Sequence, residues 1–248
     1  MMQTASIDHS APAFFIAPLP AAMKLRRLLR PLVFHLWHPL HLYTNRKTGR
    51  AKVGVLKLHT DPDVFNPARH FSSKILANCV ADLKLDGRRV LDMGTGSGII
   101  GVTAALRGAQ VMAVDLNPHA AALAALNARE HGVAASMRVF CGDLFEPFPA
   151  SAKFDWIIFN PPFFARAAEH LVQAAYNAGV GLETVTRFLA QARLHLSLEG
   201  NVLMILSSDM PLNRLAALFE KFDYHIIRCE LAQHVFEMFY LVQLRPGR

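Results

Sequence analysis

The sequence predicts an α/β domain with a seven-stranded, mostly parallel sheet, helices on both faces and an antiparallel last strand. Short apolar segments alternate with longer helical segments from residue 89 onward, which is typical of a parallel sheet flanked by helices. A glycine-rich turn follows the first strand, and two prolines end the fourth. The expected strands are 89–92, 110–115, 137–140, 154–159, 200–207, 223–229 and 235–244, and the expected helices are 98–107, 118–131, 183–197 and 211–221.

The earlier residues form a basic N-terminal extension, 1–60, attached to a larger domain, 61–248. Alanine and proline are frequent in the first 20 residues, which we expect to be poorly ordered. The elements expected next are a helix over 21–38 with a break at Pro31, a hairpin over 41–58 with its turn at 45–50, and a helix over 69–83.

Cysteine use and hydropathy limit the class of protein. The three cysteines lie far apart without a C-x-x-C pair, so we expect neither a disulfide framework nor a zinc site, and no metal set is visible. No apolar run reaches the ~18 residues that span a bilayer, and we see no signal peptide. The sequence therefore favours a reducing, cytoplasmic setting.

Positive charge is concentrated near the N-terminus. Residues 1–70 hold ten Lys or Arg and three acids, whereas the remaining chain has no net charge. The segment Lys24–Arg30 can form a basic amphipathic helix that contacts an anionic surface, either a membrane or a nucleic acid. The alternative is a helix that packs its leucines on the domain and leaves its arginines in solvent.

The most informative motif follows the apolar segment 154–159. Pro161 and Pro162 prevent the strand from continuing, so Asn160 lies at its carboxyl end, where ligands bind in open α/β sheets. The Asn160 side-chain oxygen and the peptide carbonyl of Pro161 are acceptors, and Phe163 offers a flat apolar face. This set suits a planar NH₂ group, whose hydrogens would bind the acceptors while its plane stacks on the ring.

A second motif follows the strand 89–92. Asp92 ends this strand, and Gly94, Gly96 and Gly98 form a turn that lets the backbone approach a ligand at a helix N-terminus. The dinucleotide pattern G-x-G-x-x-G also matches at residues 96–101, but we interpret that match as accidental because Gly94 is the first glycine of the turn. An acid before the glycines suits a cationic amino group better than a pyrophosphate.

Two further acids follow the next strands. Asp115 ends the strand 110–115, at the position where an acid accepts hydrogen bonds from ribose hydroxyls. Asp143 follows the strand 137–140 and is placed to accept from an adenine amino group. Because parallel strands end at one edge of a sheet, we expect the three acids and the glycine turn to line one site.

In these motifs, their order and their spacing, residues 60–245 resemble class I S-adenosylmethionine-dependent methyltransferases, which have a Rossmann-like fold. Asn-Pro-Pro-Phe resembles the branch that methylates amino groups, including release-factor glutamine methyltransferases. The segment 63–71 is similar to one that covers cofactor and target in this branch. The resemblance implies catalytic roles for Asn160 and Pro161 and substrate contacts for Pro162, Phe163, Phe65 and Pro67. It implies S-adenosyl-L-methionine binding by Asp92, Gly94, Thr95, Gly96, Gly98, Asp115, Leu116, Asp143, Leu144 and Asn160.

Three functions remain open at this point. The first is N-methylation of a planar nitrogen in a protein glutamine or a small molecule. The second is the same chemistry on an exocyclic base amine of RNA or DNA, which the basic extension favours. The third is a nicotinamide-dependent oxidoreductase, which would leave Asn-Pro-Pro-Phe unexplained. The extension also differs from the helical bundle that precedes the catalytic domain of release-factor enzymes.

Removal of residues 1–40 tests the two interpretations of the extension. If Lys24–Arg30 contacts an anionic surface, the truncated protein should keep its cofactor affinity and lose affinity for anionic vesicles or RNA, and added salt should have the same effect. Sedimentation with vesicles and RNA filter binding measure this. A lower melting temperature with unchanged surface binding would favour the packed helix.

Overall fold

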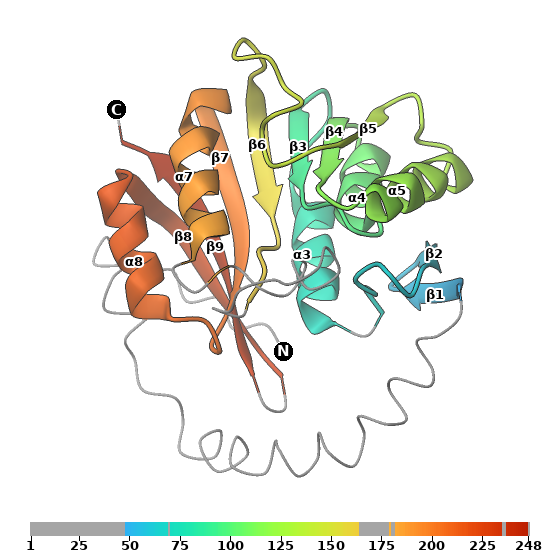
Figure 1. Cartoon of the computed structure of the whole chain (residues 1–248), viewed down its shortest axis with the longest axis horizontal. Helices are drawn as coiled ribbons and strands as arrows, with labels where there is room; N and C mark the ends of the chain where they lie inside the picture. The colour runs from blue at the N-terminus through green and yellow to red at the C-terminus, as the bar shows by residue number, and fades with distance from the viewer. Residues whose placement is uncertain (1–47, 69, 164–178, 180–181, 235–236, 248) are drawn as a thin grey trace.

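The computed structural model describes residues 48–68, 70–163, 179, 182–234 and 237–247, in which seven strands form one sheet (Figure 1). The strand order is β5-β4-β3-β6-β7-β9-β8. The strands are β3 (Arg89–Met93), β4 (Gln110–Asp115), β5 (Met137–Cys141), β6 (Phe154–Phe159), β7 (Leu196–Ser207), β8 (Tyr224–Gln233) and β9 (Met238–Pro246). The helices are α3 (Phe71–Asp82), α4 (Ile99–Leu106), α5 (Pro118–Glu130), α7 (Glu183–His195) and α8 (Leu212–Lys221).

The sheet is mostly parallel, as the alternation of segments predicts. Strands β3 to β7 pair in parallel, and β9 pairs antiparallel with both β7 and β8. The predicted seven strands and antiparallel last strand are therefore confirmed. The strands 110–115 and 154–159 have the predicted bounds, whereas β7 begins at Leu196 and β8 extends to Gln233.

Both faces of the sheet are buried, which explains its continuous apolar strands. Consecutive residues of a strand point to opposite faces, and Ile157 and Ile158 of β6 are both fully buried in different cores. Ile157 packs in the core beneath α7 and α8, and Ile158 in the core beneath α3, α4 and α5 (Figure 1). The prediction of helices on both faces is confirmed.

The hairpin before the sheet differs from its prediction. Strands β1 (Gly49–Val53) and β2 (Leu56–Thr60) pair antiparallel, and the turn lies at Gly54 and Val55 rather than at residues 45–50. The predicted continuous strand 52–58 is therefore wrong. Gly54 has φ +60°, a left-handed conformation that favours glycine and allows the tight turn.

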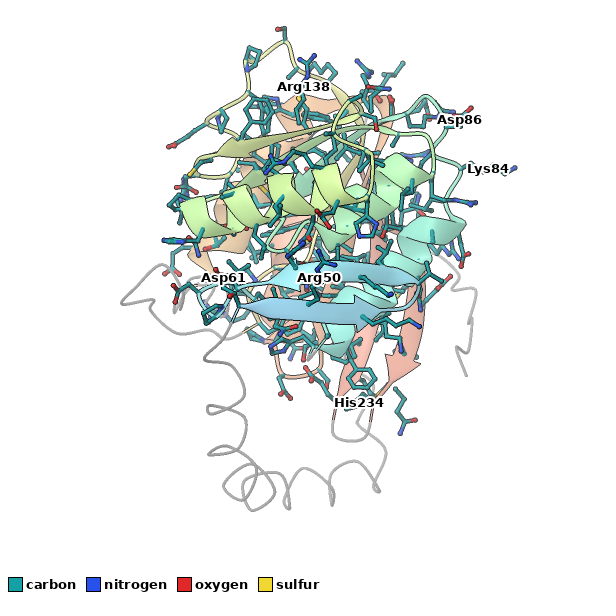
Figure 2. The ribbon with its side chains drawn as sticks, turned by 90° about the vertical axis from the view of Figure 1, so that its right-hand side faces the viewer. Arg50, Asp61, Lys84, Asp86, Arg138 and His234 are labelled. Atoms are coloured by element: carbon teal, nitrogen blue, oxygen red, sulfur yellow. The ribbon has the colours of Figure 1, made fainter. Side chains whose placement is uncertain are left out.

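This hairpin packs on the body of the domain, because its Leu58 is fully buried in the core shared with α3 to α5. Figure 2 shows the hairpin, with Arg50 and Asp61 labelled, lying along α5. The link is Asn127 of α5, whose Oδ1 accepts from His59 N at 2.7 Å and whose Nδ2 donates to His59 O at 3.1 Å. Nδ2 also donates to Ser97 O at 2.8 Å, so one buried amide joins β2 to the glycine turn.

Several predicted features of the extension lie outside the described residues: the first 20 residues, the helix 21–38 with Lys24–Arg30, and the strand 41–44. The helix predicted over 69–83 corresponds to α3. Among the described helices, none is long and apolar enough to cross a membrane.

Loss of the Asn127 amide should destabilise the whole domain. The variant Asn127→Ala leaves buried backbone groups of His59 and Ser97 without partners, and we expect a loss of ~2–4 kcal/mol in the free energy of unfolding. Urea denaturation measures it. The matched control is Asn213→Ala, at an exposed position of α8, which should change stability by less than ~0.5 kcal/mol. Equal effects of the two substitutions would contradict the role of Asn127.

Candidate active site

The glycine turn between β3 and α4 has the conformation that its sequence predicts. Gly94, Gly96 and Gly98 have φ values of +64°, +53° and +82°, which residues with a side chain rarely adopt. Gly98 also lies against α5, where a Cβ atom would be 3.0 Å from the Ala124 Cα. The turn therefore brings backbone N–H groups at the start of α4 to the carboxyl edge of the sheet.

Asp92 holds this turn from beneath. It is buried, and its Oδ2 accepts from Thr95 Oγ1 at 2.6 Å and from Gly101 N at 2.8 Å. Burial raises the Asp92 pKa from 3.8 to about 7, although both hydrogen bonds lower it. A Cβ on Gly101, the last glycine of the dinucleotide pattern, would lie 2.6 Å from Met137 Cε, so the Met137 side chain would have to shift to admit it.

Asp115 binds the same turn from the end of β4. Its Oδ2 accepts from Gly96 N at 2.8 Å, and its Oδ1 accepts from Asn117 N at 2.9 Å. Burial raises the Asp115 pKa, and these two backbone N–H groups oppose the shift. Two acids with raised pKa values beside one glycine turn are typical of a functional site.

Asp143 and Leu144 follow the end of β5, and Asp143 lies at the same edge. The Oδ2 atom of Asp143 accepts from Arg187 Nη2 of α7 at 2.8 Å, an ion pair that the sequence analysis did not identify. Leu144 is buried with φ +51°, whereas Leu116, the residue after β4, is 45% exposed. The predicted cofactor residues therefore include both buried and solvent-accessible side chains.

As predicted, Asn160 immediately follows β6. This strand runs downward in Figure 1. The register pairs Met93 of β3 with Phe159 of β6, so Gly94 and Asn160 leave neighbouring strands at the same level. Pro161 and Pro162 are buried behind it. The catalytic candidate therefore lies directly beside the glycine turn.

The hydrogen bonding of the Asn160 amide is unequal. Nδ2 lies 3.4 Å from Ser72 Oγ and 3.5 Å from Ser73 Oγ, both on α3. Oδ1 is buried and has no hydrogen-bond partner among the described residues. Because buried polar atoms are rarely unpaired, this oxygen is an acceptor available to a donor that enters the site.

The predicted substrate residues lie on two segments, one before α3 and one after β6. Phe163 is half-buried, with its ring 6.1 Å from that of Phe239 on β9. Phe65 is also half-buried and stacks on His70 with ring centres 3.9 Å apart. Pro67, which lies between Phe65 and His70 in the sequence, is buried.

The segment that carries Phe65 is fixed to the cofactor side of the site by Asn117. Its Nδ2 donates to Asp63 O at 2.9 Å, while its Oδ1 caps α5 by accepting from His119 N at 3.0 Å. The sequence analysis missed Asn117, although Asn before Pro118 is a recognisable cap signal. Ser72, Ser73 and Arg187 carried no such local signal.

The polar groups at this edge are backbone N–H donors, carboxylate acceptors and one amide, and they fit an adenosyl group linked to an amino acid. Asp115 would hold ribose hydroxyls and Asp143 an adenine amino group, in agreement with their positions on successive strands. Within the part of the chain that the structure describes, no group of three or more His, Cys, Asp or Glu could hold a metal ion.

Comparison with known proteins identifies the family. The model of the methyltransferase small domain matches residues 55–234, and the chain belongs to this family. It is therefore an enzyme that transfers methyl groups, and S-adenosyl-L-methionine is the methyl donor. This membership excludes the third function that the sequence left open, a nicotinamide-dependent oxidoreductase.

Three curated relatives share this region. A provisionally named protein N5-glutamine methyltransferase of Methanocaldococcus jannaschii is 35% identical over 161 residues, 62% of this chain and 76% of that protein. The ribosomal protein uL3 glutamine methyltransferase of Bordetella pertussis is 36% identical over 62% of this chain and 55% of its own. A tRNA1(Val) (adenine(37)-N6)-methyltransferase of Actinobacillus pleuropneumoniae is 31% identical over 53% of this chain. The chain spans 56% of this last relative.

Solved structures share the fold at low identity. The ribosomal protein L11 methylase of Lactobacillus delbrueckii has a TM-score of 0.58 at 21% identity, covering 75% of this chain and 84% of that one. The 16S rRNA N2 G1207 methyltransferase of T. thermophilus, in complex with AdoMet and guanosine, has a TM-score of 0.61 at 19% identity. Its alignment covers 82% of this chain and 50% of that one. The Rossmann-like fold is confirmed.

The raised pKa of Asp92 predicts a pH dependence of stability. Between about pH 4 and pH 7 the folded protein keeps a proton that the unfolded chain releases, so this carboxyl lowers stability as pH rises through that window. Asp92→Asn should remove this contribution and make the protein ~2–4 kcal/mol more stable than wild type at pH 8, with little difference below pH 4. Urea denaturation at several pH values measures it.

Asp155→Asn is the control of opposite sign. Partial burial alone would raise the Asp155 pKa, but hydrogen bonds from Arg89 and Ser197 lower it below 3.8. That carboxylate stabilises the fold above its unfolded pKa and loses this effect as pH falls. Parallel pH profiles of wild type and Asp92→Asn would contradict the assignment.

Proposed function

We propose that this methyltransferase transfers the methyl group of S-adenosyl-L-methionine to the side-chain amide nitrogen of a glutamine in a protein. The observation that carries the proposal is the unpartnered, buried Oδ1 of Asn160 beside the glycine turn. An acceptor oxygen at this position fits a substrate that brings N–H donors. Two of the relatives are named as glutamine methyltransferases, which supports a protein amide.

The chemistry requires positioning more than a strong base. An amide nitrogen is a poor nucleophile because its lone pair is delocalised into the carbonyl group. The bound sulfonium supplies an activated methyl carbon. Asn160 Oδ1 and the Pro161 carbonyl would hold the two hydrogens of the substrate NH₂ and orient its nitrogen within ~3–3.5 Å of that carbon. Both oxygens also favour the partial positive charge that the nitrogen gains as it attacks.

The aromatic residues complete this arrangement. Phe163, packed beside Phe239, would stack on the flat amide group and exclude water from the reacting atoms. Phe65 and Pro67 would close the site from the other side, because Asn117 ties their segment to the end of β4. Asp92 fixes the glycine turn and thereby the position of the methyl donor.

The second candidate is N-methylation of an exocyclic base amine. It is favoured by the tRNA adenine methyltransferase among the relatives and by the basic extension. An adenine amino group is also planar and carries two hydrogens, so the same acceptors suit it. Contact of Lys24–Arg30 with an anionic surface, and a location on such a surface, rest on charge alone and belong to this proposal.

Methyl transfer from deuterium-labelled S-adenosyl-L-methionine tests the proposal. The enzyme is incubated with a dialysed cell extract, and the labelled molecules are identified by mass spectrometry. We expect the label on a glutamine side chain of a protein, unaffected by nuclease treatment. Label in RNA or DNA would favour the second candidate, and label on a carboxyl or hydroxyl oxygen would overturn both.

Asn160→Ala tests the role of the acceptor oxygen. Loss of one oriented electrostatic partner should reduce the rate of label transfer by ~10²–10³-fold, while calorimetry should show near-normal affinity for S-adenosyl-L-methionine. Asn213→Ala on α8 is the matched control and should transfer at the wild-type rate. Wild-type turnover by Asn160→Ala would refute the mechanism.

A further inference from the structure

We infer that Ser72 and Ser73 of α3 are positioning residues, which orient the Asn160 amide so that its oxygen faces the methyl acceptor. This inference rests on the proposed function, because it explains how the acceptor oxygen of that mechanism is presented. It adds the first turn of α3 to a site whose other proposed residues lie on the loops after β3, β4, β5 and β6 and on the segment before α3.

The hydrogen bonds of the amide account for its orientation. A primary amide has two N–H hydrogens that diverge from the nitrogen and one carbonyl oxygen on the opposite branch. The two serine hydroxyls lie 3.4 Å and 3.5 Å from Nδ2, so each can accept one hydrogen. With both hydrogens directed toward α3, Oδ1 is left buried and unpartnered on the other side.

The burial of the serines supports the same assignment. Ser72 is 2% exposed and Ser73 is 4% exposed, although a hydroxyl removed from water costs ~1–3 kcal/mol unless it is hydrogen-bonded. For both hydroxyls, the partner that the described residues supply is Asn160. Two adjacent buried serines are therefore explained by the amide, which lies 88 and 87 residues away in the sequence.

The helix that carries the serines is held firmly against the sheet. Leu76 and Val80 of α3 are fully buried in the core that also contains Ile158 of β6. Asn160 follows the same strand, so the serines and the amide are fixed to opposite sides of one packed interface. Each contact is long for an N–H···O bond and is weak by itself, but both involve Nδ2, so together they favour the orientation in which this nitrogen faces α3.

The effect on catalysis follows from the polarity of the amide. If it rotated by half a turn, its N–H groups would face the N–H groups of the substrate, and neither could bind the other. Such a rotated amide would also disfavour the positive charge that develops on the attacking nitrogen. The serines would therefore influence turnover without contacting the substrate or the methyl donor.

The double variant Ser72→Ala/Ser73→Ala tests this role. We expect the rate of label transfer into the protein fraction of a fixed, nuclease-treated extract to fall about tenfold at saturating S-adenosyl-L-methionine. Affinity for S-adenosyl-L-methionine, measured by calorimetry, should stay within about twofold of wild type, because the serines do not form the glycine turn. Each single variant keeps one hydroxyl, and its rate of label transfer should lie between those of the wild type and the double variant.

Ser136→Ala is the matched control, since it removes a hydroxyl whose partner among the described residues is the nearby Val133 carbonyl. It should transfer label at the wild-type rate. A drop in the melting temperature of the double variant, with equal losses of cofactor affinity and turnover, would show that the serines only stabilise the fold. Unchanged turnover in the double variant would overturn the inference directly.

Nuclear magnetic resonance gives a readout that does not depend on the acceptor. The side-chain NH₂ signals of Asn160 can be assigned by their loss in Asn160→Ala, and they should shift in the double serine variant but not in Ser136→Ala. Unshifted signals would overturn the inference even if no acceptor were labelled. Label on a base or an oxygen, with shifted signals, would instead refute the proposed function and leave the serine contact in place.

Discussion

The hydrogen bonds that Asp92 accepts from Thr95 and Gly101 hold the glycine turn at the carboxyl edge of the sheet, where ligands bind in open α/β sheets. A turn with three residues at positive φ has few contacts of its own, and an unsupported backbone of this kind would sample many conformations. The carboxyl group beneath it accepts from the hydroxyl of Thr95 in the turn and from the backbone N–H of Gly101 in the first turn of α4. Asp115 then binds Gly96 from the neighbouring strand, so the turn is fixed to two strands at once. Burial of the charged carboxylate is unfavourable and raises the pKa of Asp92 to about 7.

The position of the Asn160 amide follows from the register of the sheet. Because Met93 pairs with Phe159, the residues that leave β3 and β6 do so together, and the glycine turn and the Asn160 amide lie side by side without any long loop between them. Phe159 itself reinforces this closeness, since a Cβ on Gly94 would lie 3.4 Å from its ring. The central strands are buried on both faces, so neither can shift by one residue without moving its side chains into the wrong core. A transfer reaction that depends on distances of a few tenths of an ångström is thus supported by strands that are buried on both faces.

Those parts of the fold and site that depend on local sequence could be predicted, and those that depend on distant packing could not. The strands 110–115 and 154–159 were predicted with their observed bounds, because Asp115 and the prolines after Asn160 mark where each apolar run ends. The predicted position of the hairpin turn was wrong because Gly54, inside an apparently continuous strand, sets the turn through its positive φ. Ser72, Ser73 and Arg187 act across separations of 88, 87 and 44 residues, and no spacing pattern along the chain records such contacts.

The same physical argument separates reaction type from substrate choice. A glutamine amide and an adenine amino group share a planar NH₂ with two hydrogens, so the acceptor pair proposed on Asn160 and Pro161 would suit either. The relatives include enzymes named for each of these acceptors. Discrimination must come from groups that bound the rest of the acceptor. At this edge Phe71, the residue before the two serines, is 48% exposed and packs on His234 with ring centres 3.7 Å apart. Burial lowers the pKa of His234, which favours a neutral imidazole beside that ring. An uncharged, flat and partly exposed surface of this kind suits planar groups that stack. Phe71 directly precedes Ser72 and Ser73, whose hydroxyls lie beside the Asn160 amide.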